Sequence, residues 1–434
     1  MAQPLSAPTN SAPISARPGT DGATAPAPLD RGRESVSTPA RKKVPGPLAT
    51  TKQRYQLQAG IARLLRGKNG RGPSVCGCGR VAFEKTEVGV YLNEGGRAGL
   101  IGATRCGSLF LCPVCAMRRS MQLGDRAGAA AQACIDQGGA VWFITLTVRH
   151  HNRQSLRTLK AALMAGWKTL QQGRAFIAFR ERAGLLGMVR TIETPWGPTH
   201  GWHVHLHVLA LFEGRDFEAQ EAWCEEIIAR WRFLMAAQGF DARRQAQDCR
   251  RCFNGETAAE YATKGAIELT ASAVKESKSD LIHPFEIAAR AVAGDDAAEA
   301  VWREYAAVMP GTQQAVVSKR LATALGISNE GEVEPDVERV MLPVVGAVRP
   351  YAWNTLHRGG VLGVLLELVE GTCTTAGPGW EAAVDPWIEA QVRRLDPANA
   401  KRASELTRKR RKAAPGVGPG QSPSRPPEDM PLAA

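Results

Sequence analysis

The alternation of apolar and polar positions divides the middle of the chain into short strands and amphipathic helices. Residues 141–148, Val-Trp-Phe-Ile-Thr-Leu-Thr-Val, are β-branched and aromatic, which is typical of a strand. Residues 155–182 repeat apolar side chains every three to four positions, which predicts a helix. Residues 185–194 and 202–212 return to the strand pattern, and the turn-rich segment 195–201 between them predicts a hairpin.

Similar patterns extend this series towards the C-terminus. A helix is expected at 217–238, a weaker strand at 244–252, and another helix from Glu256. The resulting order β-α-β-β-α-β predicts an α+β fold, a ferredoxin-like antiparallel sheet with helices on one face. Further helices are expected outside this core, at 116–137, 286–309 and 316–325.

The two ends of the chain differ from the middle in composition. Residues 1 to about 50 are rich in Pro, Ala, Ser and Gly, and from about Asp396 a basic run leads into Pro-rich sequence. Such segments bury too little apolar surface to offset the entropy of ordering, so we expect them to be disordered. We therefore divide the chain into a disordered N-terminal region (1–70), a Cys-rich zinc-binding module with its linking helix (71–137), an α+β core (138–275), a mainly helical accessory region (276–395) and a basic disordered tail (396–434).

Net charge and hydropathy narrow the class of partner. The formal net charge of +13 favours a polyanion such as nucleic acid, because Lys and Arg that neutralise phosphates release counterions. The alternative is a solubilising surface with basic tails. No apolar run reaches the roughly 18 residues of a membrane span, and Pro4 and Pro8 interrupt the stretch where a signal peptide would be apolar. We expect a cytoplasmic protein with no membrane partner.

The strand at 202–212 carries the most specific chemistry. His203, His205 and His207 alternate with aliphatic residues, so the three imidazoles are expected on one face of the sheet. Three imidazoles in a row make poor core packing and a good metal site. The alternative is a chance alternation on a solvent-exposed strand.

A hard cation such as Mg²⁺ or Mn²⁺ also needs an oxygen ligand. Glu193 lies near the end of the preceding strand, across the predicted hairpin from the histidines. Whether it reaches the same face depends on the strand register. An exposed carboxylate at a strand end is the alternative.

The segment after the predicted sheet contains a candidate nucleophile. Tyr261 and Lys264 are three residues apart, so on a helix the ammonium lies beside the phenol and favours the phenolate. With a metal polarising a phosphate, a tyrosine can attack phosphorus directly. A tyrosine near a lysine on a helix is otherwise common.

The cysteines form a second cluster. The pair Cys112 and Cys115 has CxxC spacing, and Cys106 lies just upstream. A fourth thiolate from Cys76 or Cys78 would complete a tetrahedral zinc site, and the sequence leaves the choice between these two open. The alternative is a set of buried free thiols.

Three of these segments resemble the motifs of rolling-circle replication initiators of the HUH endonuclease superfamily, most closely the plasmid Rep proteins. Residues 143–148 are similar to their first motif, 201–209 to the metal-binding strand, and 261–264 to the catalytic helix. The resemblance extends from about Cys76 to Ile327, and it identifies the predicted core at 138–275 with the HUH endonuclease core.

The resemblance implies a role for each matching residue. His205 and His207 would be the metal-binding pair, Glu193 would complete the metal sphere, and His203 would be a ligand or a neighbouring donor. Tyr261 would attack the scissile phosphate and leave a 5′-phosphotyrosyl link and a 3′-hydroxyl primer, with Lys264 steadying the phosphate. The implied partners are single-stranded or hairpin DNA at a replication origin, and host helicase and polymerase.

The chain departs from the family pattern at one position. Some members of this plasmid family carry a glutamate one helical turn before the tyrosine, which activates water at termination, but this chain has Thr257 there. The nearest carboxylates are Glu256 and Glu260, neither well placed on an ideal helix. How the covalent intermediate is resolved therefore stays open. A mobilisation relaxase or transposase with the same chemistry, and a zinc-dependent DNA-binding regulator without catalysis, are the alternative functions.

Overall fold

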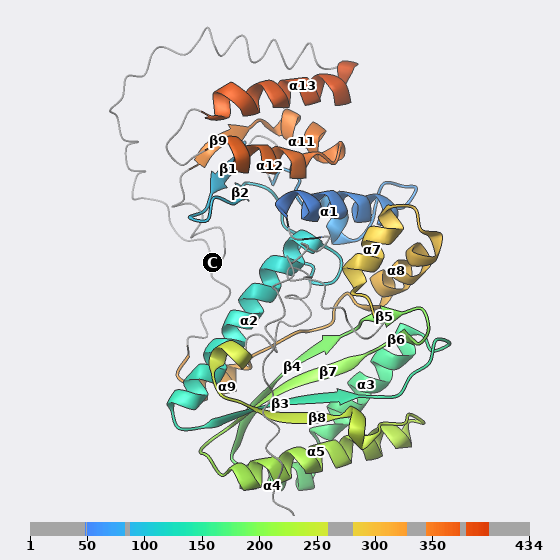
Figure 1. The fold of residues 1–434 in the computed structure, drawn as a ribbon, viewed down its shortest axis with the longest axis vertical. Helices are drawn as coiled ribbons and strands as arrows, with labels where there is room; N and C mark the ends of the chain where they lie inside the picture. Colours follow the sequence, from blue (N-terminus) through green and yellow to red (C-terminus); the bar gives the residue numbers. More distant parts are fainter. Residues whose placement is uncertain are drawn as a thin grey trace, which may run out of the picture. The chain divides into compact units, whose positions relative to one another are not determined.

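The computed structural model describes Leu48 and residues 50–82, 87–258, 281–327, 344–373 and 379–398. All of these belong to one compact unit, Lys43–Ala434. The fold is mixed α+β, with antiparallel sheets and helices (Figure 1). None of the helices in these ranges has the length and apolar character that crossing a bilayer requires.

The largest sheet has four strands in the order β4-β7-β3-β8, and every neighbouring pair is antiparallel. The hairpin predicted between the second and third core strands is confirmed. β3 and β7 lie in the centre of the sheet because nearly every position of both is apolar and buried. The strands are β3 (Ala140–Thr147), β4 (Leu185–Glu193), β7 (His205–Phe212) and β8 (Asp248–Cys252). The strand expected at 244–252 is thus shorter, with a 3₁₀ turn, η2 (Arg244–Ala246), before it.

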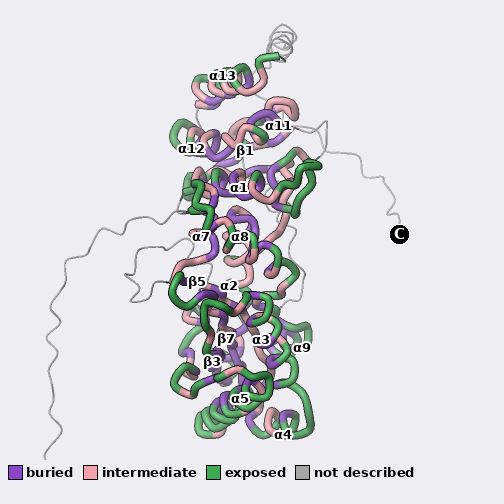
Figure 2. Tube along the Cα trace, turned by 90° about the vertical axis from the view of Figure 1, so that its right-hand side faces the viewer, coloured by how far each residue is buried: buried purple, intermediate pink, exposed green. Residues whose placement is uncertain are grey.

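One face of this sheet is covered by three helices, α3 (Leu156–Leu170), α4 (Arg174–Arg182) and α5 (Phe217–Ala237). α5 buries Trp223 and Trp231 completely, and its exposed side faces away from the sheet (Figure 2). Burying a large apolar side chain stabilises a fold by about 1.5–3 kcal/mol. The single helix predicted at 155–182 is two helices, because Gly173 adopts φ +92°, a left-handed conformation that ends helical geometry.

The described helices of the predicted core lie on one face, and the opposite face is covered by helices from outside that core. α2 (Pro113–Asp136) and α9 (Lys319–Ala324) pack there against Phe143, Leu209 and Leu211. Small alanines on α2, such as Ala130, let this helix lie close to the sheet. The apolar cluster ends at Phe143 and Leu209, and the next inward positions along the two strands are polar, Thr145 and His207.

The N-terminal and C-terminal parts of the described chain fold together. β1 (Val88–Leu92) pairs with β2 (Ala98–Ile101) on one side and with β9 (Val344–Val348) on the other. The Cys-rich module and the accessory region, which the sequence analysis divided into two regions, therefore share one sheet. Around them lie α11 (Pro350–Arg358), α12 (Leu362–Thr372), the π-helical turn η3 (Trp380–Val384) and α13 (Asp385–Leu395).

The predicted disorder of residues 1–70 does not extend over 51–65, which form helix α1 (Thr51–Leu65). Thr50 and Gln53 make a reciprocal capping box at its start. Leu57 and Ile61 are buried, and α1 packs against α12. The helix at 286–309 is also divided, into α7 (Pro284–Val292) and α8 (Asp296–Val308), by Gly294 at φ +97°.

Candidate active site

The strand register places the predicted ligands in two neighbouring cross-strand rows. His205 on β7 lies opposite Glu193 of β4 and opposite Thr147 of β3. His207 lies opposite Thr145 of β3. Directly opposed residues project from the same face of a sheet, so the carboxylate and both imidazoles lie on one face, where α2 and α9 no longer cover it.

The three side chains converge on a small volume. Oε2 of Glu193 contacts Nε2 of His205 and lies 2.7 Å from Nε2 of His207. The donor atoms of these three residues are all within 4.8 Å of one another, a spacing that could hold one metal ion. Each side chain is no more than 12% exposed.

The residues around His207 fix its ring. The ring stacks on Phe143 with centroids 5.1 Å apart, and Nδ1 lies 3.2 Å from Oγ1 of Thr145. When Nδ1–H donates to this hydroxyl, Nε2 keeps its lone pair towards Glu193. This is the tautomer that a metal ligand needs.

The electrostatics favour an ionised carboxylate. Burial by itself raises the pKa of Glu193, but hydrogen bonds and charge interactions with His205 and His207 lower that pKa well below its usual range. Burial, followed by the charges of His205 and His150, lowers the pKa of His203 to about 4. The site therefore combines a carboxylate with histidines, of which His203 is neutral at neutral pH.

His203 is not part of the converging group. Its Nδ1 lies 2.6 Å from Nε2 of His150. The strand predicted at 202–212 is interrupted here, because Trp202 in β6 (Gly201–Trp202) pairs with Trp196 in β5 (Trp196–Gly197), whereas His205 pairs with Glu193. The backbone changes partner between Trp202 and His205, so His203 lies outside the paired rows, although its ring is 5.1 Å from that of His205, centroid to centroid.

The predicted nucleophile lies outside the described residues, which omit 259–280 and thus Tyr261, Lys264 and Glu260. The structure describes the helical turn just before them. Asn254 caps this turn by accepting a hydrogen bond from the backbone N–H of Thr257 at 2.8 Å. Gly255 donates its N–H to Gln132 of α2 at 2.9 Å. Glu256 is exposed on this turn.

The cysteine cluster contains Cys78 and excludes Cys76. The Sγ atoms of Cys78, Cys106, Cys112 and Cys115 lie within 4.8 Å of one another and could hold a metal ion. Cys76 instead directs its thiol to the carbonyl of Ala62, at 3.5 Å. Of the two residues that the sequence left open, the structure thus brings Cys78 to the other three thiols.

Local structure explains how the thiols meet. Cys112 is the N-cap of α2, so Cys112 and Cys115 lie on its first turn. The C-terminal part of the chain supports the opposite side: Nε2 of His357 lies 2.8 Å from the carbonyl of Cys78, and the indole N–H of Trp353 donates to the carbonyl of Gly79 at 2.7 Å. These two contacts could not be anticipated from the spacing of the cysteines.

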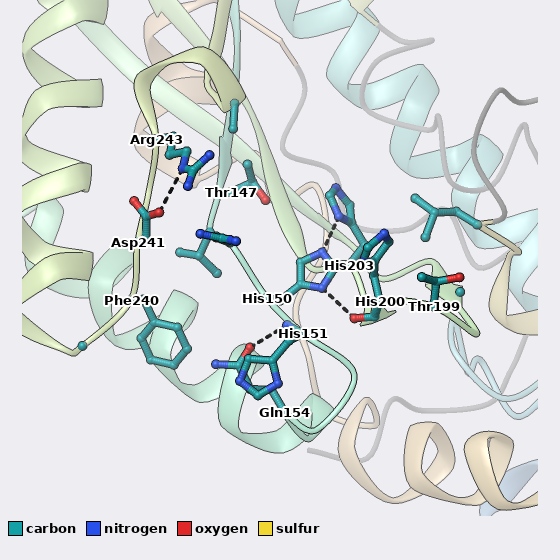
Figure 3. A pocket seen from close by; sticks show the side chains of 16 residues that line it. Thr147, His150, His151, Gln154, Thr199, His200, His203, Phe240, Asp241 and Arg243 are labelled. Carbon is teal, nitrogen blue, oxygen red and sulfur yellow. Dashed lines mark hydrogen bonds and ion pairs between the residues drawn. The ribbon is translucent and has the colours of Figure 1, made fainter.

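A pocket beside the carboxylate and histidines was also missed by sequence reasoning (Figure 3). It has a volume of about 1020 Å³, and its lining includes His150, His151, His200 and His203. The available signal was clustering, since six of the eight histidines of the chain lie at 150–151 and 200–207.

Three relatives illustrate what the chain resembles. "Protein rep" of Streptomyces lividans is 26% identical over 313 residues, 56% of this chain and 68% of that protein. "Protein rep" of Bacillus amyloliquefaciens is 30% identical over 136 residues, 30% of this chain and 38% of that protein. "Neomycin resistance protein" of Streptomyces cyanogenus is 28% identical over 144 residues, 28% of this chain and 33% of that protein. The latter two alignments span less than half of the relatives' length.

No solved structure gives a significant match to this chain. The sequence profile of the Rep_1 family, described as "Replication protein", matches residues 100–339. This match includes the strands that carry Glu193, His205 and His207, and it covers more than half of the 434 residues. The chain therefore belongs to the Rep_1 family of replication proteins.

Proposed function

We propose that this chain is a plasmid rolling-circle replication initiator that nicks one DNA strand through Tyr261. The convergence of Glu193, His205 and His207 on one sheet face carries the proposal, because in a replication protein it brings three ligand atoms close enough to hold one divalent cation. The order β3-α3-β4-β7-α5-β8, with β3 and β7 central, supports a ferredoxin-like HUH core.

The side chains of this group suit Mg²⁺ or Mn²⁺. Two imidazole nitrogens and one carboxylate oxygen provide part of a coordination sphere, and waters and a phosphate oxygen would complete it. A divalent ion held there would polarise the scissile phosphate and neutralise charge in the transition state.

The remaining chemistry belongs to the chain. The phenolate oxygen of Tyr261 would form a bond to phosphorus, while the bond from phosphorus to the 3′ oxygen breaks. The departing oxygen takes a proton from Lys264 or from water and becomes the 3′-hydroxyl primer. Rejoining is the reverse attack of a 3′-hydroxyl on the phosphotyrosine. Glu256 or Glu260 would activate water if the link is hydrolysed instead.

The four thiolates of Cys78, Cys106, Cys112 and Cys115 suit zinc. Tetrahedral Cys₄ sites of this kind are structural. Zinc here would fix the start of α2 to the turn η1 (Ser74–Gly77) and to α11. We assign this ion no part in the cleavage. Host helicase and polymerase are the partners expected of an initiator.

The proposal is tested with purified full-length protein, Mn²⁺ and labelled single-stranded DNA from the parent replicon. A protein–DNA adduct that survives denaturant, fails to form with EDTA and is absent in Tyr261→Phe is the expected result. Tyr351→Phe is the matched control, because Tyr351 lies on α11 with its hydroxyl donating to Asp396. DNA that is shifted in a native gel but never cut would overturn the proposal and favour a DNA-binding regulator.

A further inference from the structure

We call the candidate ligands Glu193, His205 and His207 the metal-binding group. The pocket beside this group is built from three loops at one end of the main sheet (Figure 3). They follow β3 at 148–154, join β5 to β6 at 197–200, and follow α5 at 239–246. The pocket adjoins the metal-binding group through two of its lining residues. Thr147 lies opposite His205 in the sheet, and the ring of His203 is 5.1 Å from that of His205, centroid to centroid.

Hydrogen bonds between the loops hold the walls in place. The backbone N–H of Arg149 donates to the carbonyl of Asp241 at 2.7 Å and ties the first loop to the third. The ring of His150 lies 3.0 Å from the carbonyl of His200 and 2.6 Å from Nδ1 of His203, which ties the first loop to the second. These contacts join the three loops and hold the walls of the pocket together.

The lining chemistry suits an anion. Arg149 and Arg243 contribute guanidinium groups, and four histidines line the same space. Among the described residues that line the pocket, Asp241 is the one acidic residue, and its carboxylate pairs with Arg243 at 3.1 Å. A phosphate can therefore approach this wall without facing an unpaired carboxylate.

The lining chemistry also suits a nucleobase. Phe240 is half-buried and lines the pocket, and its backbone N–H is held by the carbonyl of Met235 at 2.9 Å. Aromatic side chains beside cations are the usual means of binding unpaired nucleotides, because every base has a face that can stack. The pocket volume of about 1020 Å³ is at the upper end of the range for small-ligand sites. The pocket therefore has space for about one or two nucleotides.

We propose that this pocket binds an unpaired nucleotide next to the scissile phosphate, with its base against Phe240 and its phosphate facing Arg149 and Arg243. The inference rests on the proposed function, since it takes DNA as the substrate of the neighbouring group. A base can enter such a pocket only when it has left its stack and its partner. The pocket thus selects single-stranded DNA and positions the phosphate for attack, without taking part in bond breaking.

The test measures binding separately from cleavage. Full-length Tyr261→Phe protein in EDTA is mixed with single-stranded oligonucleotides that carry 2-aminopurine at successive positions around the nick. We expect quenching at one position, and its loss in Phe240→Ala and Phe240→Leu. Leucine keeps the apolar volume without the aromatic face, so the pair separates stacking from folding. Affinity should fall about 5- to 150-fold.

The matched control is Phe233→Ala, because Phe233 is an aromatic residue on α5 that is 73% exposed and does not line the pocket. It should leave quenching and affinity unchanged. For the phosphate, Arg243→Gln should reduce the slope of log affinity against log salt by about 0.7. Arg174→Gln on α4, outside the pocket, should not change this slope.

The outcomes separate this proposal from the proposed function. Quenching that survives in both Phe240 variants, or that Phe233→Ala also abolishes, overturns the nucleotide pocket even when the Tyr261-dependent adduct forms normally. Conversely, DNA that the unsubstituted protein never cuts overturns the nuclease assignment, while position-specific quenching by Phe240 still supports the pocket.

Discussion

Glu193 and His205 lie directly opposite each other on the paired strands β4 and β7. The carboxylate contacts His205 and, one row further along, His207. Two strands of one hairpin therefore provide all three candidate ligands, and their meeting depends on the register of that hairpin. A slip of one residue would move Glu193 to the face covered by α3 and α5.

From the geometry we expect the three alternating histidines to fall into two functional classes. Glu193→Ala, His205→Ala and His207→Ala should each lower Mn²⁺ affinity and adduct formation by at least about 10- to 100-fold, since removing a ligand should cost no less than removing an outer partner. His203→Ala should keep Mn²⁺ binding within about threefold. Titration of Mn²⁺ by calorimetry measures the difference. Equal losses in all four variants would show that His203 is a ligand.

The cysteine geometry predicts which thiol matters for zinc. Cys78→Ser should lose bound zinc and lower the melting temperature, because three thiolates hold the ion less tightly than four. Cys76→Ser should keep one full equivalent of bound zinc, since the Cys76 thiol points to the carbonyl of Ala62. Metal content by mass spectrometry of the purified proteins decides between them. Zinc retained by Cys78→Ser but lost by Cys76→Ser would refute the assignment.

The sequence predicts those elements whose formation depends on nearby residues, and it does not predict contacts between segments far apart in the chain. β3, β7 and α5 follow from periodicity within one segment, and the hairpin follows from its turn. The sequence did not predict that residues 51–65 fold into α1, because part of the buried face of this helix packs against α12, about 300 residues away. The sequence also did not show that Cys78 joins the other three thiols, or that His203 lies outside the group formed by Glu193, His205 and His207. The first depends on the turn at 74–77, and the second on a change of strand partner.

The turn that begins the predicted catalytic helix can lie close to α2 because Gly255 has no side chain. A Cβ at this position would lie 2.6 Å from the carbonyl oxygen of Gly128, so Gly255→Ala must push the turn away from α2. We expect adduct formation to fall at least about tenfold, because small displacements of a nucleophile are costly. Mn²⁺ affinity should not change.

The control for this substitution is Gly371→Ala in α12. Among the described residues, no atom outside the neighbouring residues and the helix's own backbone lies within 4 Å of a Cβ at Gly371, so alanine there should leave adduct formation unchanged and stabilise the helix by up to about 1 kcal/mol. Full adduct formation by Gly255→Ala would mean that the described turn does not position Tyr261.

Cys134 should make the protein less stable in alkali. Burial raises the pKa of this thiol from 9.0 to about 11. The unfolded chain therefore loses the proton first, and the stability contributed by the protonated thiol is complete below about pH 9 and is lost as pH rises towards 11. The free energy of unfolding should fall over this window, by less than about 1.4 kcal/mol per pH unit from one group. Urea unfolding of Cys134→Ala should show a shallower fall between pH 9 and 11. A difference in the free energy of unfolding between the two proteins at pH 7 reports packing alone. The prediction would be contradicted if the free energy of unfolding fell with pH at the same slope in both proteins between pH 9 and 11.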